Sequence, residues 1–122
     1  MNDLIEIAKE VIENHYQKGR HSTGAAMRTK SGKVYTGISI NAQKLHLCSE
    51  WGALHQAFLA GESEIEMIVA VHRTCEGDFE IYSPCGLCRE LFITYCPDAE
   101  VILSDKTSVR AKDLLPNAWQ KK

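Results

Sequence analysis

The sequence predicts an α/β sandwich with a mixed sheet. Segments with helical periodicity and segments with strand-like patterns follow one another in the order helix, hairpin, helix, strand, helix, strand. A hairpin followed by alternating helices and strands is typical of a mixed sheet that helices cover. The chain of 122 residues contains no repeat and no linker rich in Pro, Gly and Ser, so we expect one domain over residues 1–122.

The first half of the chain supplies a helix and a hairpin. Apolar residues recur at helical spacing from about residue 3 to residue 18, and Gly19 follows as a stop signal. Two strands are expected next, over residues 24–29 and 34–40, because apolar and polar residues alternate in the second. The Ser-Gly pair between them suits a hairpin turn.

The second half alternates helices and strands. A second helix should begin near Cys48 and end before Gly61, and apolar side chains around nearly its whole circumference predict that it is central and buried. Residues 67–71 are apolar on both faces, as interior strands tend to be. The remaining elements are an extended segment at Phe79–Tyr82, a third helix opening at residues 83–86, a strand at 101–103 and a short helix before Pro116.

Composition and charge limit the partners of the chain. Lys and Arg number 14 against 16 Asp and Glu, the net charge is −2, and basic residues form no cluster. Nucleic-acid binding requires a cationic face, so we expect no such partner and instead a small neutral or zwitterionic ligand. The apolar runs are too short to span a bilayer and the N-terminal residues lack the pattern of a secretory signal, so we expect no membrane partner.

Cysteine is the unusual feature of the composition. Five cysteines, an odd number without an export signal, favour reduced thiols in a cytoplasmic protein. Cys85 and Cys88 are three residues apart at a predicted helix start, where both sulfurs can hold one ion. Cys48 also stands at a helix start, and two helix N-termini stabilise the thiolates that Zn²⁺ requires. The other two, Cys75 and Cys96, are interpreted as buried or incidental thiols.

Three ligands would leave a fourth tetrahedral position for water, as in catalytic zinc sites. Glu50 follows Cys48 by two positions, where a carboxylate can take a proton from activated water and pass it to a leaving group. The alternatives are a structural zinc site closed by a fourth cysteine, and buried cysteines without a metal.

These motifs resemble the cytidine deaminase family along nearly the whole chain. Cys48-Ser49-Glu50 and the segment from Ser83-Pro84-Cys85 to Cys88-Arg89 are similar to the zinc-binding signature of the family, in the variant with three cysteine ligands. Residues 24–26, 32–37 and 114–116 also fall in family order. Residues 21–32 and 83–91 look most similar to the bacterial blasticidin S deaminases.

The resemblance implies a three-layer α/β/α sandwich with a sheet of about five strands, a Zn²⁺ cofactor and a homotetramer. It also implies a reaction in which zinc activates water for attack on the carbon bearing the exocyclic amine, Glu50 moves protons, and ammonia leaves. The backbone near Ser49 and Ser83 would contact the base. Family members that act on polynucleotides usually have histidine as the first ligand, so Cys48 favours a free nucleoside.

Two departures from the family concern the sugar of the substrate. Nucleoside deaminases typically end their second strand with Asn-x-Glu, which binds the ribose hydroxyls, and the matching residues here are Ser39 and Asn41. Without the carboxylate a charge-assisted hydrogen bond is lost, so we expect weak discrimination over the sugar. Both residues can equally be ordinary polar groups at a strand end. The loop at residues 42–47 is also shorter than in typical members.

The remaining candidates come from the same resemblance. Many relatives place an arginine after the catalytic glutamate to offset the thiolate charge, where this chain has Trp51; Arg89 is the best remaining cation, or else a solvated surface residue. His21 falls where relatives often carry a pocket phenylalanine, which makes it a candidate for a stacking or base-facing role, although an ordinary polar contact is the alternative that we favour. Trp119 matches an aromatic that in relatives packs into a neighbouring subunit's pocket; a surface position or local packing is the alternative. For His46 we expect an ordinary polar contact.

These features predict hydrolytic deamination of a free cytosine nucleoside or a related aminopyrimidine nucleoside. One alternative is deamination of a cytosine-nucleoside antibiotic such as blasticidin S, because pyrimidine salvage and antibiotic resistance share the chemistry and differ in the sugar pocket. The alternative outside enzymes is a structural zinc module for protein interaction, which has no need of an acid at Glu50.

Overall fold

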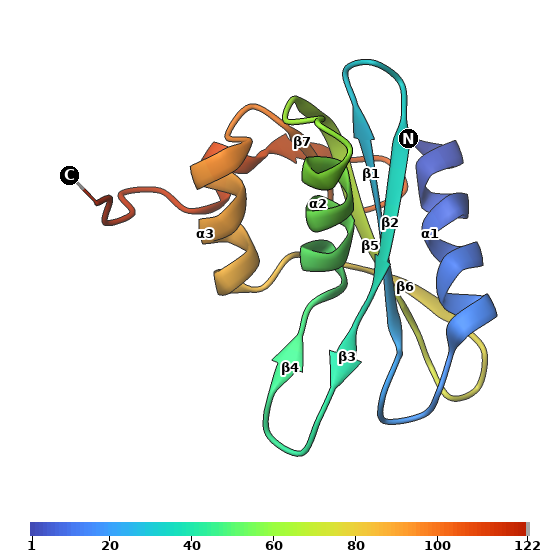
Figure 1. The fold of residues 1–122 in the computed structure, drawn as a ribbon. Coiled ribbons are helices and arrows are strands. Elements are labelled where there is room, and N and C mark those ends of the chain that lie inside the picture. The colour runs from blue at the N-terminus through green and yellow to red at the C-terminus, as the bar shows by residue number, and fades with distance from the viewer. Residues whose placement is uncertain (122) are drawn as a thin grey trace.

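A six-stranded mixed sheet forms the middle layer of the computed structural model, which describes residues 1–121 (Figure 1). One helix covers one face of the sheet and two helices cover the other, so the expected three-layer α/β/α sandwich is confirmed. The helices are α1 (Asn2–His15), α2 (Ser49–Leu59), α3 (Gly86–Tyr95) and the 3₁₀ helix η1 (Ala111–Leu114). The strands are β1 (Thr23–Thr29), β2 (Val34–Ile38), β3 (Ile40–Asn41), β4 (His46–Leu47), β5 (Ile65–Arg73), β6 (Phe79–Tyr82), β7 (Glu100–Ile102) and β8 (Ser108–Arg110).

Strand β5 is the centre of the sheet. The strand order is β2-β1-β5-β7-β8, and β6 pairs with β5 beyond the end of β7. β5 is antiparallel to β1 and β6 but parallel to β7, which confirms the mixed sheet. Its residues Val69, Ala70 and Val71 are buried, as expected for an interior strand.

Two apolar clusters fill the spaces between the layers. Successive residues of β1 point to opposite faces of the sheet, so this strand contributes to both clusters. The buried cluster beneath α1 consists of Leu4, Ile5, Ala8, Ala26, Val69, Val71 and Ile102. The cluster beneath α2 and α3 consists of Ala25, Met27, Ala53, Leu54, Ala57, Ile65, Ile68, Cys88, Phe92, Cys96, Ala99, Val101 and Ala111.

Gly37 of β2 decides how closely α2 lies against the sheet. A β-carbon at this position would stand 2.6 Å from the backbone nitrogen of Ala53 and 3.0 Å from the carbonyl carbon of Gly52. Real β-carbons do not approach backbone atoms this closely, so only glycine allows this packing. The first turn of α2, which carries Ser49 and Glu50, is thereby held against the sheet.

The first helix ends three residues earlier than predicted. It ends at His15, and Tyr16 adopts an extended backbone with φ −59° and ψ 131°. The ring of Tyr16 lies beneath the guanidinium of Arg73, 3.9 Å from ring centroid to Cζ. This contact with β5 stabilises the chain outside the helix from Tyr16 onward.

The second predicted strand is interrupted, and two short strands were not predicted from the sequence. β2 ends at Ile38, and Ser39 separates it from β3, which pairs with β4 in a small hairpin of its own. β8 pairs with β7 at the sheet edge. Strands of two or three residues carry too few alternations for a period-two pattern to appear.

The prediction that α2 is buried on nearly all sides is wrong. Ala53, Leu54 and Ala57 face the sheet and are buried, whereas Leu59 is 76% exposed and Trp51 38% exposed. The sheet packs against one side of α2, and residues 1–121 supply no further layer for the other side. The apolar side chains around α2 are therefore more numerous than a single copy of the chain can bury.

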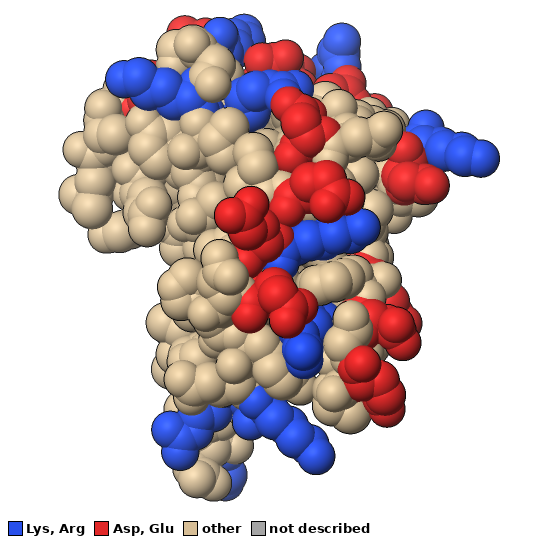
Figure 2. All heavy atoms as spheres, turned by 90° about the vertical axis from the view of Figure 1, so that its right-hand side faces the viewer, with Lys and Arg blue, Asp and Glu red and all other residues tan. Residues whose placement is uncertain are grey.

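The surface on the α1 side mixes charges of both signs. Figure 2 shows acidic and basic side chains interleaved over this face. Several are paired, as Glu6 is with Lys9 at 3.4 Å and Glu13 with Arg73 at 3.1 Å. Within residues 1–121, no helix combines the length and hydropathy needed to cross a bilayer.

Candidate metal centre and active site

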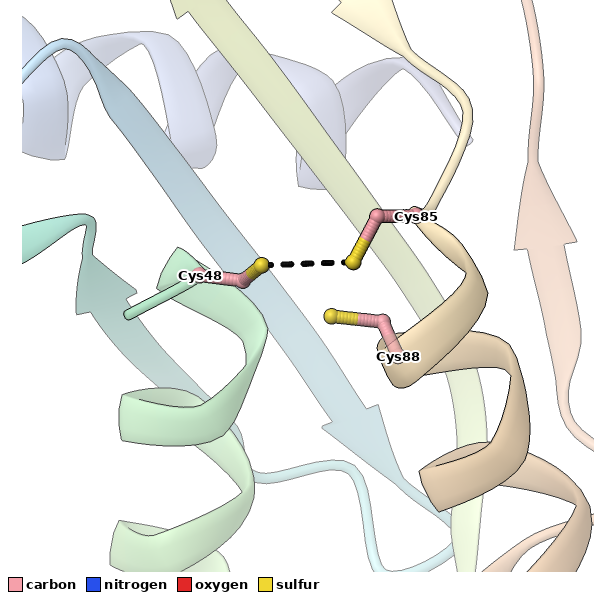
Figure 3. A group of neighbouring side chains, drawn as sticks. All are labelled: Cys48, Cys85 and Cys88. Atoms are coloured by element: carbon pink, nitrogen blue, oxygen red, sulfur yellow. Dashed lines mark hydrogen bonds between the residues drawn. The ribbon is translucent and has the colours of Figure 1, made fainter. Parts of the chain in front are cut away.

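Three cysteine sulfurs converge between the N-termini of α2 and α3 (Figure 3). Cys48 is the N-cap residue of α2, Cys85 is the N-cap residue of α3, and Cys88 lies in the first turn of α3. The sulfurs of Cys48 and Cys85 are 3.4 Å apart, and all three lie within 4.8 Å of one another. Residues 37 positions apart in sequence thus form one cluster.

The cluster fits a zinc ion. Zn–S bonds of about 2.3 Å in a tetrahedral site require sulfurs that are ~3.8 Å apart, which agrees with the spacing here. Zn²⁺ binds soft thiolate ligands well. The N-termini of α2 and α3 place positive dipole ends beside these thiolates and stabilise them. Pro84 favours an extended conformation for the residue before it. β6 therefore ends at Tyr82, and α3 begins after its N-cap residue Cys85.

Burial resists ionisation of two of the thiols. It raises the pKa of Cys48 to about 11, with a further contribution from the hydrogen bond to Cys85, and it raises the pKa of Cys88 as well. For Cys85, burial acts in the same direction, but the backbone N–H of Cys88 and the neighbouring thiols outweigh it and lower the pKa. Three thiolates this close require a cation between them, and zinc supplies it.

Glu50 lies at the start of α2, beside the cluster. Its side chain is only 5% exposed, and the hydroxyl of Ser49 donates a hydrogen bond to Oε1 at 3.2 Å. Burial raises the pKa of Glu50, while its own backbone N–H and the Ser49 hydroxyl act in the opposite direction. A buried carboxyl group whose proton affinity is raised can accept and return a proton near neutral pH.

Glu50, Cys48 and Cys85 line one pocket of about 190 Å³. The pocket lies where the start of β1, the residue that follows β2, the β3–β4 hairpin, the start of α2 and the end of β6 meet. The other lining residues are Ser22, Thr23, Ser39, Asn41, His46, Leu47, Ser49, Ala70, Tyr82 and Ser83. Four of the five residues that the sequence suggested for substrate contact, Ser39, Asn41, Ser49 and Ser83, are therefore among them.

The two residues suggested for the sugar differ in their surroundings. Ser39 is buried, and its Oγ accepts hydrogen bonds from the backbone N–H groups of Ser22 (3.1 Å) and Thr23 (3.0 Å). It therefore joins the end of β2 to the start of β1. Asn41 is half-buried, and its side chain reaches across the small hairpin to His46.

Arg89 holds the polypeptide around the metal ligands. Its guanidinium donates to the carbonyl oxygen of Pro84 (2.9 Å), the carbonyl oxygen of Leu114 (3.0 Å) and Oγ of Ser83 (2.8 Å). None of the hydrogen bonds that this side chain makes in residues 1–121 goes to a cysteine sulfur. Charge balance by Arg89 would act through space, and it stays a prediction.

The remaining predicted residues lie outside the pocket. Nδ1 of His21 donates to the carbonyl oxygen of Ser39 at 2.8 Å, and the ring borders a neighbouring depression, so a base-facing role stays a prediction. Trp119 is 83% exposed beside Leu87 and Cys85, on the side of α3 that faces solvent. Its place in a neighbouring subunit's pocket also stays a prediction.

Several pocket residues escaped the sequence analysis. Tyr82 forms part of the wall, with its ring stacked on His72 at a centroid distance of 4.6 Å. Thr23, at the start of β1, lies beside the same histidine. The signal available for Tyr82 was its position two residues before Pro84; nothing in the spacing marked Thr23, and for His46 the sequence suggested only an ordinary polar contact.

Comparison with known proteins agrees with this site. Residues 1–104 match the family model of the cytidine and deoxycytidylate deaminase zinc-binding region. A blasticidin-S deaminase from Bacillus cereus is 35% identical over 107 residues, an overlap that covers 83% of this chain and 76% of the relative.

Solved structures show the same fold. The cytidine deaminase from Burkholderia pseudomallei shares 33% identity with a TM-score of 0.79, covering 97% of this chain and 98% of that chain. The cytidine deaminase from Bacillus anthracis shares 23% identity with a TM-score of 0.81, covering 97% and 88%, which supports the fold alone. The sequence match and the cysteine cluster beside Glu50 place this chain in the family of zinc-binding cytidine and deoxycytidylate deaminases.

Proposed function

We propose that the protein deaminates a free cytosine nucleoside or a related aminopyrimidine nucleoside by hydrolysis. The observation that carries this proposal is that buried Glu50 shares one small pocket with the sulfurs of Cys48 and Cys85. A structural zinc module needs no carboxyl group beside the metal. Burial of a carboxyl group costs stability, so its presence favours a function in the reaction.

The pocket residues divide the chemistry among them. Cys48, Cys85 and Cys88 would hold the zinc ion, which supplies Lewis-acid activation of water when bound. Glu50 accepts two protons in turn, both from the attacking water, and it delivers the first to the ring nitrogen of the pyrimidine and the second to the departing amine, so that it is unprotonated again at the end. One C–O bond forms and one C–N bond breaks, so that water and the amine become a carbonyl and ammonia. Ser49 orients Glu50 through its hydroxyl.

The size of the pocket supports a nucleoside. About 190 Å³ is below the range of about 300–1,000 Å³ for sites that enclose drug-sized ligands. A single pyrimidine ring can enter to reach Glu50, while a sugar attached to it stays at the open side. Neutral side chains line that side, which agrees with an uncharged or zwitterionic substrate.

A second candidate substrate is blasticidin S. The 35% identity to the Bacillus cereus blasticidin-S deaminase favours it, as does the neutral pair Ser39 and Asn41 where a carboxylate was expected. The reacting base is a cytosine in both candidates, so the same zinc site and Glu50 serve either one. The two substrates differ only in the part that lies near the sugar. That part of the pocket therefore decides between pyrimidine salvage and antibiotic resistance.

We also propose that the protein works as a homotetramer in the cytoplasm. Large apolar side chains are exposed on α2 and α3: the rings of Phe58 and Tyr95 are paired at 5.2 Å between centroids at the end of α3, and Trp119 is exposed beside Leu87 at its start. Burial of these surfaces against other copies would remove them from water and close the open side of the pocket. The five unpaired cysteines suit a reducing compartment. Light scattering of the zinc-loaded protein tests the tetramer, and a monomer at micromolar concentration would contradict it.

The function is tested by incubating the zinc-loaded protein with cytidine, deoxycytidine, 2′,3′-dideoxycytidine and blasticidin S, and measuring ammonia and deaminated product. We expect equal amounts of both products from at least one substrate. With Asn41 in place of a carboxylate, dideoxycytidine should lose much less than several orders of magnitude in kcat/KM relative to cytidine. Full zinc occupancy without ammonia from any of the four compounds would contradict the proposal.

A further inference from the structure

The β3–β4 hairpin brings a histidine into the pocket that the zinc motifs do not include. Asn41 and His46 are directly opposite one another in the hairpin, and both line the pocket that contains Glu50. Nδ1 of His46 is 3.0 Å from Oδ1 of Asn41. The two side chains therefore form a hydrogen-bonded pair at the pocket wall.

The backbone fixes this pair relative to the reaction centre. The N–H of Ala42 donates to the carbonyl oxygen of Leu45 at 2.8 Å, which closes the turn between the two residues. The N–H of Asn41 donates to the carbonyl oxygen of Arg20 at 3.0 Å and ties the hairpin to the main body. At its other end, β4 leads directly into Cys48. The hairpin is thus anchored on both sides, and His46 has a defined position.

The hydrogen bond decides which groups of the pair face a ligand. An amide oxygen has no hydrogen, so Nδ1 of His46 must donate to Asn41. Nε2 of the neutral ring then remains as an acceptor, and the amide NH₂ of Asn41 remains as a donor. One donor beside one acceptor is complementary to hydroxyl groups, which can both donate and accept.

Glu50 and His46 lie at different depths in the pocket, and this difference indicates that the Asn41–His46 pair lies near the sugar of a bound nucleoside. Glu50 is buried, so the pyrimidine must enter deeply to reach it, whereas His46 is exposed at the rim. A substituent on the ring nitrogen opposite the reacting carbon therefore lies near the rim. Ser39 contributes less there, because its Oγ already accepts two backbone hydrogen bonds.

We propose that His46 is a specificity-determining residue, which together with Asn41 binds a hydroxyl group of the substrate's sugar. The inference rests on the proposed deamination of a nucleoside. It gives a role to the short loop at residues 42–47, whose tight turn brings residue 46 opposite residue 41. The pair binds substrate and leaves the chemical step to Glu50, so its loss should raise KM and spare kcat.

The test compares a nucleoside with a base that lacks the sugar. For cytidine, His46→Ala should lower kcat/KM by about 3- to 10-fold, through KM, as the loss of neutral hydrogen bonds does. For 1-methylcytosine the same variant should match the unchanged protein within about twofold. Lys44→Ala is the matched control, because Lys44 is exposed in the same turn and does not line the pocket. Asn41→Ala should cost about as much as His46→Ala, and the double variant little more, since the two act as one unit.

A binding measurement separates failure of this inference from failure of the proposed function. Calorimetry with the product uridine and with 1-methyluracil needs no turnover, and His46→Ala should weaken only uridine. Equal losses for cytidine and 1-methylcytosine, no loss for either, or unchanged uridine binding would overturn the role of His46 while deamination stands. Absence of ammonia from every substrate would instead overturn the proposed function, and the uridine experiment would still decide about His46.

Discussion

The α-carbon of Gly37 in β2 lies 3.4 Å from the point where a β-carbon on Gly52 of α2 would stand. Strand and helix therefore meet backbone against backbone at this point, about one turn along α2 from Cys48 and two residues after Glu50. The positions of Cys48 and Glu50 depend on this contact, because both belong to the helix start that it holds in place.

Gly37→Ala should destabilise the protein and disturb the site. The added methyl group would collide with the Ser49 carbonyl oxygen and the Ala53 nitrogen, which are backbone atoms that cannot turn away. Overpacking of this kind costs about 1–3 kcal/mol, or roughly 5–15 °C in Tm for a domain of this size. Thermal unfolding of the zinc-loaded protein measures it.

Gly86→Ala is the control for this variant. A β-carbon at Gly86 meets no atom within 4 Å, so its Tm should change little or rise. If Gly37→Ala unfolds at the same temperature as Gly86→Ala, the close packing of β2 on α2 does not hold the helix in place.

The zinc ligands are tested by single substitutions. We expect one zinc per chain in the unchanged protein and a large loss in Cys48→Ala, because two remaining sulfurs on α3 form an incomplete site. Elemental analysis after dialysis against a weak chelator measures the metal. Cys75→Ala is the control, since Cys75 is exposed and outside the cluster. Full zinc content in Cys48→Ala would contradict the assignment of three cysteine ligands.

Glu50→Gln should keep the fold and the zinc but lose turnover. The amide has nearly the same shape and can still accept the Ser49 hydrogen bond, yet it cannot carry a proton. Loss of proton transfer of this kind lowers kcat by about 10²–10⁴-fold. Steady-state kinetics beside elemental analysis measures both properties, and activity within a few-fold of the unchanged protein would mean that another group moves the proton.

Substitutions of Arg89 can distinguish a role in balancing the thiolate charge from a role in positioning the backbone around the cysteines. Its three hydrogen bonds hold Pro84, Ser83 and Leu114 around the start of α3, and lysine keeps the charge but cannot make all three. Loss of such supporting bonds lowers metal affinity by about 10–100-fold, so we expect Arg89→Lys to resemble Arg89→Ala in zinc competition assays. Recovery of zinc affinity in Arg89→Lys would instead favour the charge-balancing role.

The two cysteines outside the cluster should differ in reactivity. Burial raises the pKa of Cys96 to about 12, so its thiol stays protonated in the folded protein and should resist iodoacetamide from pH 7 to 9, whereas exposed Cys75 is modified. The unfolded thiol ionises near pH 9, so the stability that Cys96 contributes is lost as pH rises from about 9 to 12. Peptide mass spectrometry measures both sites, with unfolded protein as the control. Modification of Cys96 at the rate of Cys75 would contradict its burial.

The sequence by itself determined the layers and the metal site of this protein. Helical and strand periodicities are local properties, and they predicted α1, α2, α3 and the central strand with errors of a few residues. The motifs around Cys48 and Cys85 predicted the zinc ligands, because ligand type and spacing follow from the chemistry of the metal. Glu50 was found by its distance of two residues from Cys48.

Only the tertiary structure decided which residues line the pocket beside the cysteines and Glu50. Thr23, Tyr82 and His46 come from separate elements, and their approach depends on strand pairing that leaves no local pattern. The same holds for Ser39, whose hydroxyl is directed to the backbone of β1 rather than left free. Contacts between residues far apart in sequence arise from packing of the whole sheet, so the pairing of Asn41 with His46 at the pocket rim became visible only when the hairpin and the strands were in place.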